Sequence, residues 1–266
     1  GIRTLWEYGS GGALRSITHV NRENRIILSF EYSYRPDGLI QSIAEYGPDG
    51  ELTISYTYET VQRLIAFEDS PGRDARYKYD PYGNMLVSSS DGHKQLLCSY
   101  NWAGQLEAVN GQPCTLDASG SVIHFAINGQ AVDLKHNDLN LITSAHRDGN
   151  RVDYQYGPDD SLICRKHNGE TTHYLPESFA DTWRPLLSRS DHGSEAFYVW
   201  EGDFPLLVIA GEQVQYFLHD HLGSIKCTVD QDGELIHTAD YSPFGIPSQR
   251  DEKATLHPGF AGMFYD

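Results

Sequence analysis

Short apolar runs alternate with polar, turn-forming clusters along the whole chain. In Tyr79–Ser89, for example, an aromatic residue is followed by the turn sequence DPYGN and then by an apolar run. Turn signals such as PDG, PYG, NG and QDG recur throughout, which is typical of many short strands joined by tight turns. The pattern predicts an all-β protein.

One short unit recurs along the chain. It starts with Tyr, has Gly four residues later and an apolar residue two positions after that. The complete copies are Tyr8, Gly12 and Leu14; Tyr34, Gly38 and Ile40; Tyr46, Gly50 and Leu52; Tyr79, Gly83 and Met85; and Tyr100, Gly104 and Leu106. Weaker copies start at Tyr58, Leu116, His136 and Tyr156. A spacing of about twenty residues between the later copies indicates a repeat architecture.

Each copy predicts a β-hairpin turn with a structural Tyr. A second aromatic residue often precedes this Tyr by two positions, as Tyr56 precedes Tyr58, and residues two apart on a strand share a face. Gly supplies the positive φ that a tight connection requires, and the apolar residue begins the returning strand. Stacked copies predict a long antiparallel ribbon with local contacts between units. Because such a ribbon exposes its edges and does not bury both faces alone, we expect it to close or coil.

One segment interrupts this rhythm. Pro176–Arg189 reads PESFADTWRPLLSR, in which Glu177–Trp183 has room for one or two helical turns before the next proline. We therefore expect helix to be below about 10% of the chain. The expected divisions are a repeat ribbon over 1–175, an irregular insert over 176–200 and a C-terminal β segment over 201–266.

Charge and length narrow the class of protein. The chain has 266 residues, 39% of them hydrophobic, and a net charge of −17. It has no cluster of five or more Lys and Arg residues, so the electrostatic footprint of a nucleic-acid binder is missing. It also has no apolar run of eighteen residues, which excludes a predicted membrane-spanning helix. The chain starts at Gly1 without an initiator Met, and we expect it to be a piece of a longer polypeptide.

The cysteines and histidines offer little catalytic chemistry. Cys98, Cys114, Cys164 and Cys227 lack metal-ligand spacing and are interpreted as small buried residues, with one disulfide as the alternative. His219 and His221 share one side of a strand and suggest a metal pair, but a structural role is favoured. His237 and Asp240 lie three residues apart, which places them on opposite faces of a strand, so they do not indicate an acid–base pair. The sequence has no GxSxG, HExxH or phosphate-binding motif.

The Asp-Gly pairs Asp37-Gly38, Asp49-Gly50 and Asp232-Gly233 suggest turns rather than calcium sites, because the carboxylate spacing of a calcium loop is absent. We therefore expect no catalytic residue, no metal and no cofactor in this chain.

The repeat resembles the YD repeat of the Rhs family, which also occurs in Tc-toxin C components and teneurins; its best copy here is Tyr79–Asn84, with Asp80 and Gly83. A more specific resemblance lies in Tyr216–Gly245, which is similar to the sequence near the end of Rhs shells. The DHLGS segment of this signature is Asp220, His221, Leu222, Gly223 and Ser224, and the DYSPFG segment contributes Asp240, Tyr241, Pro243, Phe244 and Gly245. Gly259–Asp266 resembles the opening of the Rhs-associated core.

This resemblance implies a curved, spiralling antiparallel sheet that forms part of a hollow β-shell around a C-terminal toxin. In the family, self-cleavage resembles an aspartyl reaction, and the segment that carries it, like the toxin, would lie beyond Asp266. The implied protein is a bacterial polymorphic-toxin fragment, secreted or delivered by a secretion system. Its implied partners are the rest of the parent polypeptide, the toxin cargo and delivery machinery, without nucleic acid. On a shell wall we expect a concave face without a close-packed opposing layer.

Two other classes use similar β structure. A teneurin-like adhesion module is expected to carry glycosylation sequons and paired cysteines, and the chain has no Asn-x-Ser/Thr sequon. A sugar-binding or cell-surface-binding module is expected to expose aromatic residues outside the repeat positions, for which Trp102, Trp183 and Trp200 are the candidates.

Overall fold

The computed structural model describes residues 1–70, 72–90, 95–177, 182–247 and 258–263. Within these ranges the chain forms 24 β-strands and one three-residue 3₁₀ helix, η1 (Phe260–Gly262). The strands are β1 (Arg3–Tyr8), β2 (Leu14–Val20), β3 (Ile26–Tyr34), β4 (Ile40–Gly47), β5 (Gly50–Tyr58), β6 (Leu64–Asp69), β7 (Asp74–Tyr79), β8 (Met85–Ser90), β9 (Leu96–Tyr100), β10 (Leu106–Val109), β11 (Gln112–Pro113), β12 (Thr115–Leu116), β13 (Val122–Ile127), β14 (Gln130–His136), β15 (Ile142–Arg147), β16 (Asn150–Tyr156), β17 (Leu162–His167), β18 (Glu170–Pro176), β19 (Pro185–Ser190), β20 (Glu195–Glu201), β21 (Phe204–Ala210), β22 (Gln213–His219), β23 (Ile225–Val229) and β24 (Leu235–Thr238).

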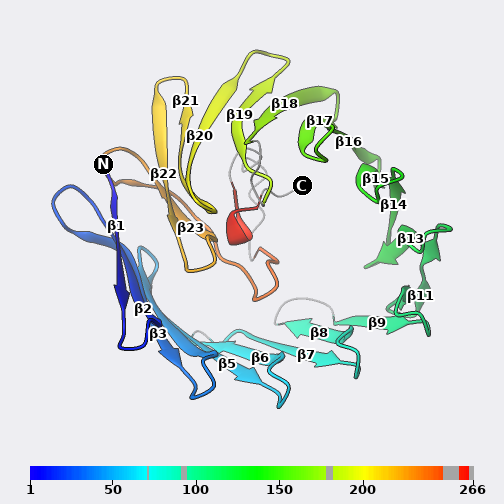
Figure 1. Ribbon diagram of the computed structural model, residues 1–266, viewed down its shortest axis with the longest axis horizontal. Helices are drawn as coiled ribbons and strands as arrows, with labels where there is room; N and C mark the ends of the chain where they lie inside the picture. The colour runs from blue at the N-terminus through cyan, green and yellow to red at the C-terminus, as the bar shows by residue number, and fades with distance from the viewer. Residues whose placement is uncertain (71, 91–94, 178–181, 248–257, 264–266) are drawn as a thin grey trace. The chain divides into compact units, whose positions relative to one another are not determined.

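The chain divides into two compact units. Unit 1 comprises residues 1–73 and 194–266, and unit 2 comprises residues 74–193. The strands form two sheets, one of 11 strands from β1 to β11 and one of 13 strands from β12 to β24. Within each sheet the strands pair with their neighbours in sequence order, as the consecutive arrows in Figure 1 show, and the paired strands run antiparallel. The predicted all-β fold of repeated antiparallel hairpins is therefore confirmed. The boundaries between these units, at 73/74 and 193/194, differ from the expected boundaries at 175/176 and 200/201.

Turns at one end of the strands carry the repeat. In the turn from β7 to β8, the amide of Asp80 donates to the Asn84 carbonyl, and the amide of Gly83 donates to the Asp80 carbonyl. Gly83 has a φ of 97°, which is the conformation that favours glycine. The pairing register shifts next to Tyr79, as it does beside the repeat Tyr of other copies. Each such bulge bends and twists its hairpin in the same place.

Turns at the other end are of a different kind. Asn128-Gly129 and Asn168-Gly169 form two-residue connections with positive φ at both positions, as the type I′ hairpin requires. Tyr46 and Gly50 belong to this end as well, because Gly47 pairs directly with Gly50 across a two-residue loop. The copy that starts at Tyr46 therefore matches the repeat in sequence but not in structure.

Unit 1 is closed by face-to-face packing. Side chains of β2 and β3, such as Ile17 and Leu28, are fully buried, and so are Leu218 of β22 and Val229 of β23. The ring of His19 meets that of His219 at 5.4 Å in an edge-on contact. The expected open concave face is therefore not found in unit 1, because the apolar faces of its first and last strands cover each other.

Unit 2 has a sparse core. Most of its described side chains are half-buried or exposed. Its buried residues are Ala75, Tyr77, Val109, Ser144, Cys164, Pro185 and Ser188. A ladder of this kind has little apolar area to cover, so local contacts between successive hairpins carry its stability.

The expected irregular insert over 176–200 is mostly regular structure. β18 pairs directly with β19, and β20 begins at Glu195, so the sheet continues through this region. Four residues of the predicted helical turns, 178–181, lie outside the described residues. The proline at position 185 is tolerated because it is the first residue of its strand.

Candidate functional site: a charged cavity at the C-terminal signature

Repeat aromatic residues link successive hairpins through their polar tips. The Tyr34 hydroxyl donates to the carbonyl of Leu14 at 2.7 Å, and Tyr58 donates to Ile40 at 2.9 Å. The same bond joins Tyr100 to Met85, Tyr156 to Ile142 and, through the indole nitrogen, Trp183 to Leu162. In each case the acceptor is the carbonyl of the apolar residue in the preceding copy. In these copies the aromatic side chain links its hairpin to the preceding one through a hydrogen bond.

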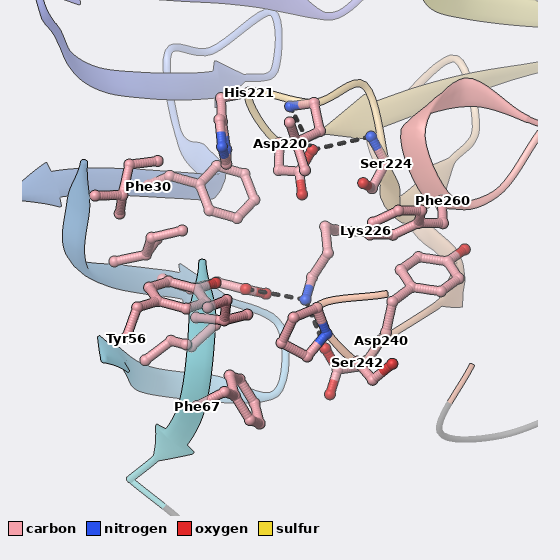
Figure 2. Close-up of a pocket in the computed structure, with 18 of the residues that line it drawn as sticks. Phe30, Tyr56, Phe67, Asp220, His221, Ser224, Lys226, Asp240, Ser242 and Phe260 are labelled. Carbon is pink, nitrogen blue, oxygen red and sulfur yellow. Dashed lines mark hydrogen bonds and ion pairs between the residues drawn. The ribbon is translucent and has the colours of Figure 1, made fainter. Parts of the chain in front are cut away.

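The two signature segments meet around a cavity in unit 1. Its volume is about 200 Å³, and Figure 2 shows how side chains from β3–β6 and from the last part of the chain converge on it. The lining residues are Phe30, Ile40, Ile43, Glu45, Ile54, Tyr56, Tyr58, Leu64, Phe67, Asp220, His221, Leu222, Ser224, Lys226, Asp240, Tyr241, Ser242, Pro243 and Phe260. The repeat strands therefore contribute a mostly apolar side of the cavity, with four aromatic and four aliphatic residues beside Glu45, and the signature contributes most of its charged and polar residues.

Lys226 is the central charge of this cavity. Its ammonium lies 2.8 Å from Asp240 Oδ1 and 3.1 Å from Glu45 Oε2, while its side chain is only 9% exposed. Arg73 contacts the other oxygen of Asp240 at 2.5 Å and also binds Asp69 at 2.6 Å. Two cations and three carboxylates thus form one network that ties β4, β6 and β23 to the DYSPFG segment.

The network keeps Lys226 and Asp240 charged against the effect of burial. Burial alone disfavours a charged Lys226, but the adjacent carboxylates of Glu45 and Asp240 outweigh it and raise the pKa of this lysine. Burial also disfavours the Asp240 carboxylate, yet contacts with Lys226 and Arg73 lower its pKa. For Glu45, burial is the dominant effect and raises the pKa. Such a network is costly to break, because removing one partner strands a buried charge.

The DHLGS segment is a capped turn of the repeat kind. Asp220 Oδ1 accepts hydrogen bonds from the amides of Leu222 and Ser224 at 2.8 and 2.9 Å. Gly223 has a φ of 83°, and the buried Ser224 hydroxyl accepts a bond of 3.1 Å from the amide of Ala261. The turn therefore anchors the chain that leads into η1.

The DYSPFG segment packs against the same helix. The Tyr241 ring lies 5.9 Å from that of Phe260. A Cβ at Gly245 would lie 2.8 Å from Cδ1 of Phe260, so glycine is required for this approach. Pro243 lines the cavity, whereas Phe244 is half exposed. Of Gly259–Asp266, positions 264–266 lie outside the described residues.

The histidines that suggest a metal pair point to different surroundings. His219 is buried and stacks on Phe204 at 4.9 Å, whereas His221 meets the Tyr32 ring at 5.0 Å and lines the cavity. Burial lowers the pKa of both. Within the described ranges, no group of three or more His, Cys, Asp or Glu residues is arranged to hold a metal ion.

His19 is the partner that sequence reasoning missed. Its Nε2–H donates to the backbone carbonyl of His219 at 2.9 Å, and its Nδ1 accepts a bond of 3.0 Å from the Thr4 hydroxyl. The acceptor role of Nδ1 requires a neutral ring, because a protonated ring carries a hydrogen on Nδ1 and can only donate there. Burial, together with the neighbouring His219, lowers the pKa of His19 to about 3.

The cysteines form no disulfide. All four thiols are free; Cys164 and Cys227 are buried, and Cys98 and Cys114 are half-buried. Burial raises the pKa of Cys227 to about 12, so this thiol remains protonated and unreactive at neutral pH. None of the helical structure in the described chain is long and apolar enough to cross a membrane.

Sequence reasoning identified the signature residues but not their partners. Glu45 and Arg73 lie far from the signature in sequence, and nothing in their local pattern marks them. Lys226 does carry a signal, because it is the one charged residue inside the otherwise uncharged run IKCTV of β23. A buried lysine is rarely tolerated without a partner.

The fold and the cavity define a class: a protein of stacked β-hairpin repeats whose last strands carry a charged, partly enclosed site. A family model described as the teneurin YD-shell matches residues 6–266. The chain belongs to the teneurin YD-shell family, and the resemblance to YD-repeat proteins is confirmed.

Solved Tc-toxin structures have the same fold. The crystal structure of TcdB2-TccC3 matches with a TM-score of 0.67 and 14% identity, over 100% of this chain and 16% of that chain. TcdB2-TccC3 without its hypervariable C-terminal region matches with a TM-score of 0.67 and 15% identity, over 100% of this chain and 16% of that one.

The Tc holotoxin pore of Photorhabdus luminescens, which carries a TccC3 mutation, matches with a TM-score of 0.63 and 14% identity, over 93% and 14% of the two chains. The chain therefore spans about a sixth of the length of these structures or less. A comparison with curated proteins finds no match. Family and neighbours together support a structural shell role.

Proposed function

We propose that this chain is a non-catalytic section of the wall of a hollow β-shell that encloses a toxin polypeptide. The observation that carries the proposal is the ladder of aromatic-to-carbonyl hydrogen bonds between successive hairpins. A wall requires many similar units that hold one another, whereas an enzyme requires a few unusual residues converging on a pocket.

The sparse core of unit 2 supports the same role. A sheet with few buried side chains is expected where it faces an enclosed space too large for side chains to fill. In a β-sandwich, by contrast, a second sheet packs against the first at a distance of about 10 Å and buries the side chains between them. The proposed partners are the rest of the parent polypeptide and its toxin segment. The proposed setting is a protein that is secreted or delivered by a bacterial system. The face-to-face packing of unit 1 would then form a thickened part of the wall.

Protease protection in the complete gene product tests enclosure. We expect the segment downstream of this chain to resist a protease that digests the same segment rapidly when it is expressed alone. Equal digestion rates in the two settings would rule out enclosure. Circular dichroism of the same protein reports the β-structure independently of the protease result. A β-spectrum together with equal digestion rates would mean that the fold is present but does not enclose the segment.

Incubation of the purified 266-residue protein tests the non-catalytic role. We expect neither a discrete self-cleavage product nor degradation of added DNA or RNA. An activity that persists through a second, orthogonal purification would contradict the proposal.

A surface-binding role is the second candidate, and exposed aromatic residues in unit 2 favour it. Trp102 is 99% exposed and Tyr82 is 91% exposed, and both lie in repeat turns. Aromatic rings in such positions suit contact with a sugar face or a cell-surface protein. Binding of the protein to a glycan array or to cells that is abolished by Trp102→Ala, but not by Val61→Ala at an exposed repeat turn of unit 1, would favour this role.

A further inference from the structure

The cavity at the signature has an unbalanced charge. Three carboxylates line it, those of Glu45, Asp220 and Asp240, against the single ammonium of Lys226. Lys226 is bound to two of the three, Glu45 and Asp240. Asp220 is the carboxylate without a cationic partner among the described residues. An anionic ligand would therefore be repelled by the lining, and a cationic ligand would be attracted.

Asp220 has a free acceptor on the cavity side. The hydrogen bonds to its side chain from described residues are both received by Oδ1. In Figure 2 the carboxylate extends from its turn into the space above Lys226. Close by in the lining, Nδ1 of His221 is buried and has no hydrogen-bond partner among the described residues. An unpaired buried ring nitrogen is costly. In the tautomer with its proton on Nε2, Nδ1 is an acceptor, and a donor bound in the cavity would remove that cost.

The mostly apolar side of the cavity suits an alkyl chain. Phe30, Ile54 and Phe67 are buried apolar residues of the repeat strands, and Tyr56 lies among them in the lining. Aromatic faces also attract cations directly. The volume of about 200 Å³ exceeds what a single water needs and lies below the lower limit of about 300 Å³ for drug-sized sites. A ligand with only a handful of heavy atoms fits this space.

We propose that this cavity binds a primary alkylammonium group. The ammonium donates to the free Oδ2 of Asp220 and to Nδ1 of His221, and the alkyl chain lies along Phe30, Ile54 and Phe67. The group can come from a free amine or from a lysine side chain of a polypeptide. This inference goes beyond the shell role and does not depend on it.

Asp220→Asn is a sharp test because the fold tolerates Asn in this turn. Asn101 and Asn137 accept the same two amide bonds in their own repeat turns, so the variant keeps the cap and loses only the charge. Asp230→Asn is the matched control, since Asp230 caps a turn in the same way but does not line the cavity. Equal melting temperatures of the two variants would show that both fold.

The measurement is an NMR titration of the full chain with n-pentylammonium chloride and with the uncharged 1-pentanol. We expect the ammonium to bind at least about tenfold more tightly than the alcohol, and Asp220→Asn to remove at least about tenfold of its affinity, as a charged hydrogen bond implies. Asp230→Asn is expected to bind as the unchanged protein does. Equal binding of amine and alcohol, equal binding by Asp220→Asn, or no binding of the amine would overturn the proposal.

A third titration distinguishes the source of the group. Nα-acetyl-lysine methylamide carries the same ammonium on a backbone that must remain outside the cavity. If it binds with Asp220-dependent affinity, the site accepts lysine side chains of a polypeptide. If only pentylammonium binds in this way, the site is for free amines.

Discussion

The Tyr34 hydroxyl lies 2.7 Å from the backbone carbonyl of Leu14, the apolar residue that starts the returning strand of the preceding repeat. This bond ties β3 to the start of β2 and recurs between other copies. The repeat is thus a unit of mutual support, because each copy provides the acceptor for the aromatic residue of the next one.

Tyr34→Phe removes this hydrogen bond and leaves the ring in place. We expect a loss of about 1 kcal/mol in the free energy of unfolding. Chemical denaturation measures it, and Tyr8→Phe is the control, because Tyr8 is 62% exposed and its replacement is expected to change stability by no more than about 0.5 kcal/mol. Equal effects at the two positions would contradict the linking role.

Gly38 tests the conformation of the repeat turn. Its φ is 86°, and a Cβ there would meet no atom within 4 Å, so a substitution acts through the backbone alone. We expect Gly38→Val to destabilise the protein by at least about 1 kcal/mol and Gly38→Asn to cost less, because Asn140 adopts a φ of 61° in the equivalent turn. Thermal unfolding of both variants measures the difference. The reverse order would show that a factor other than φ governs the turn.

Lys226→Met tests the charge network. It leaves the partly buried carboxylates of Glu45 and Asp240 without their shared cation. Because Arg73 still pairs with Asp240, we expect a loss of about 2 kcal/mol, below the roughly 3 to 5 kcal/mol of a fully buried pair. Arg25→Met is the control, because the Arg25–Glu23 pair is 70% and 69% exposed and such pairs contribute about 0 to 1 kcal/mol. Urea unfolding at neutral pH compares them. A similar small loss in both variants would mean that the network is not held closed in solution.

His19 makes stability depend on pH. Its pKa is about 3 in the folded protein and 6.5 as the ordinary value, so below pH 6.5 the unfolded chain binds the extra proton. Stability is therefore full above pH 6.5 and falls as the pH drops toward 3, by about 2 kcal/mol at pH 5 from this residue alone.

His19→Gln keeps a donor for the His219 carbonyl and removes the titration. Urea unfolding between pH 5 and 7 is expected to show a shallower pH dependence in this variant, by close to one proton. His219, whose pKa burial also lowers, keeps a residual slope in the variant. An unchanged slope would place the His19 ring in contact with water.

The local structure of this protein follows directly from its residue pattern. The positive φ of Gly83 in its DPYGN turn and the two-residue hairpin at Asn128-Gly129 follow from residue chemistry within a few positions. Because each hairpin packs on its sequence neighbour, a repeating pattern was enough to predict the antiparallel ladder and to indicate the family.

Tertiary structure alone decided which distant faces meet. His19 donates to the carbonyl of His219, 200 residues away, and Lys226 is paired with Glu45 across unit 1. It also decided that Tyr46, despite its matching pattern, lies at the other end of the strands. The physical reason is that turn chemistry acts between neighbours, whereas the packing of one sheet face on another depends on the accumulated twist and bend of every hairpin between them.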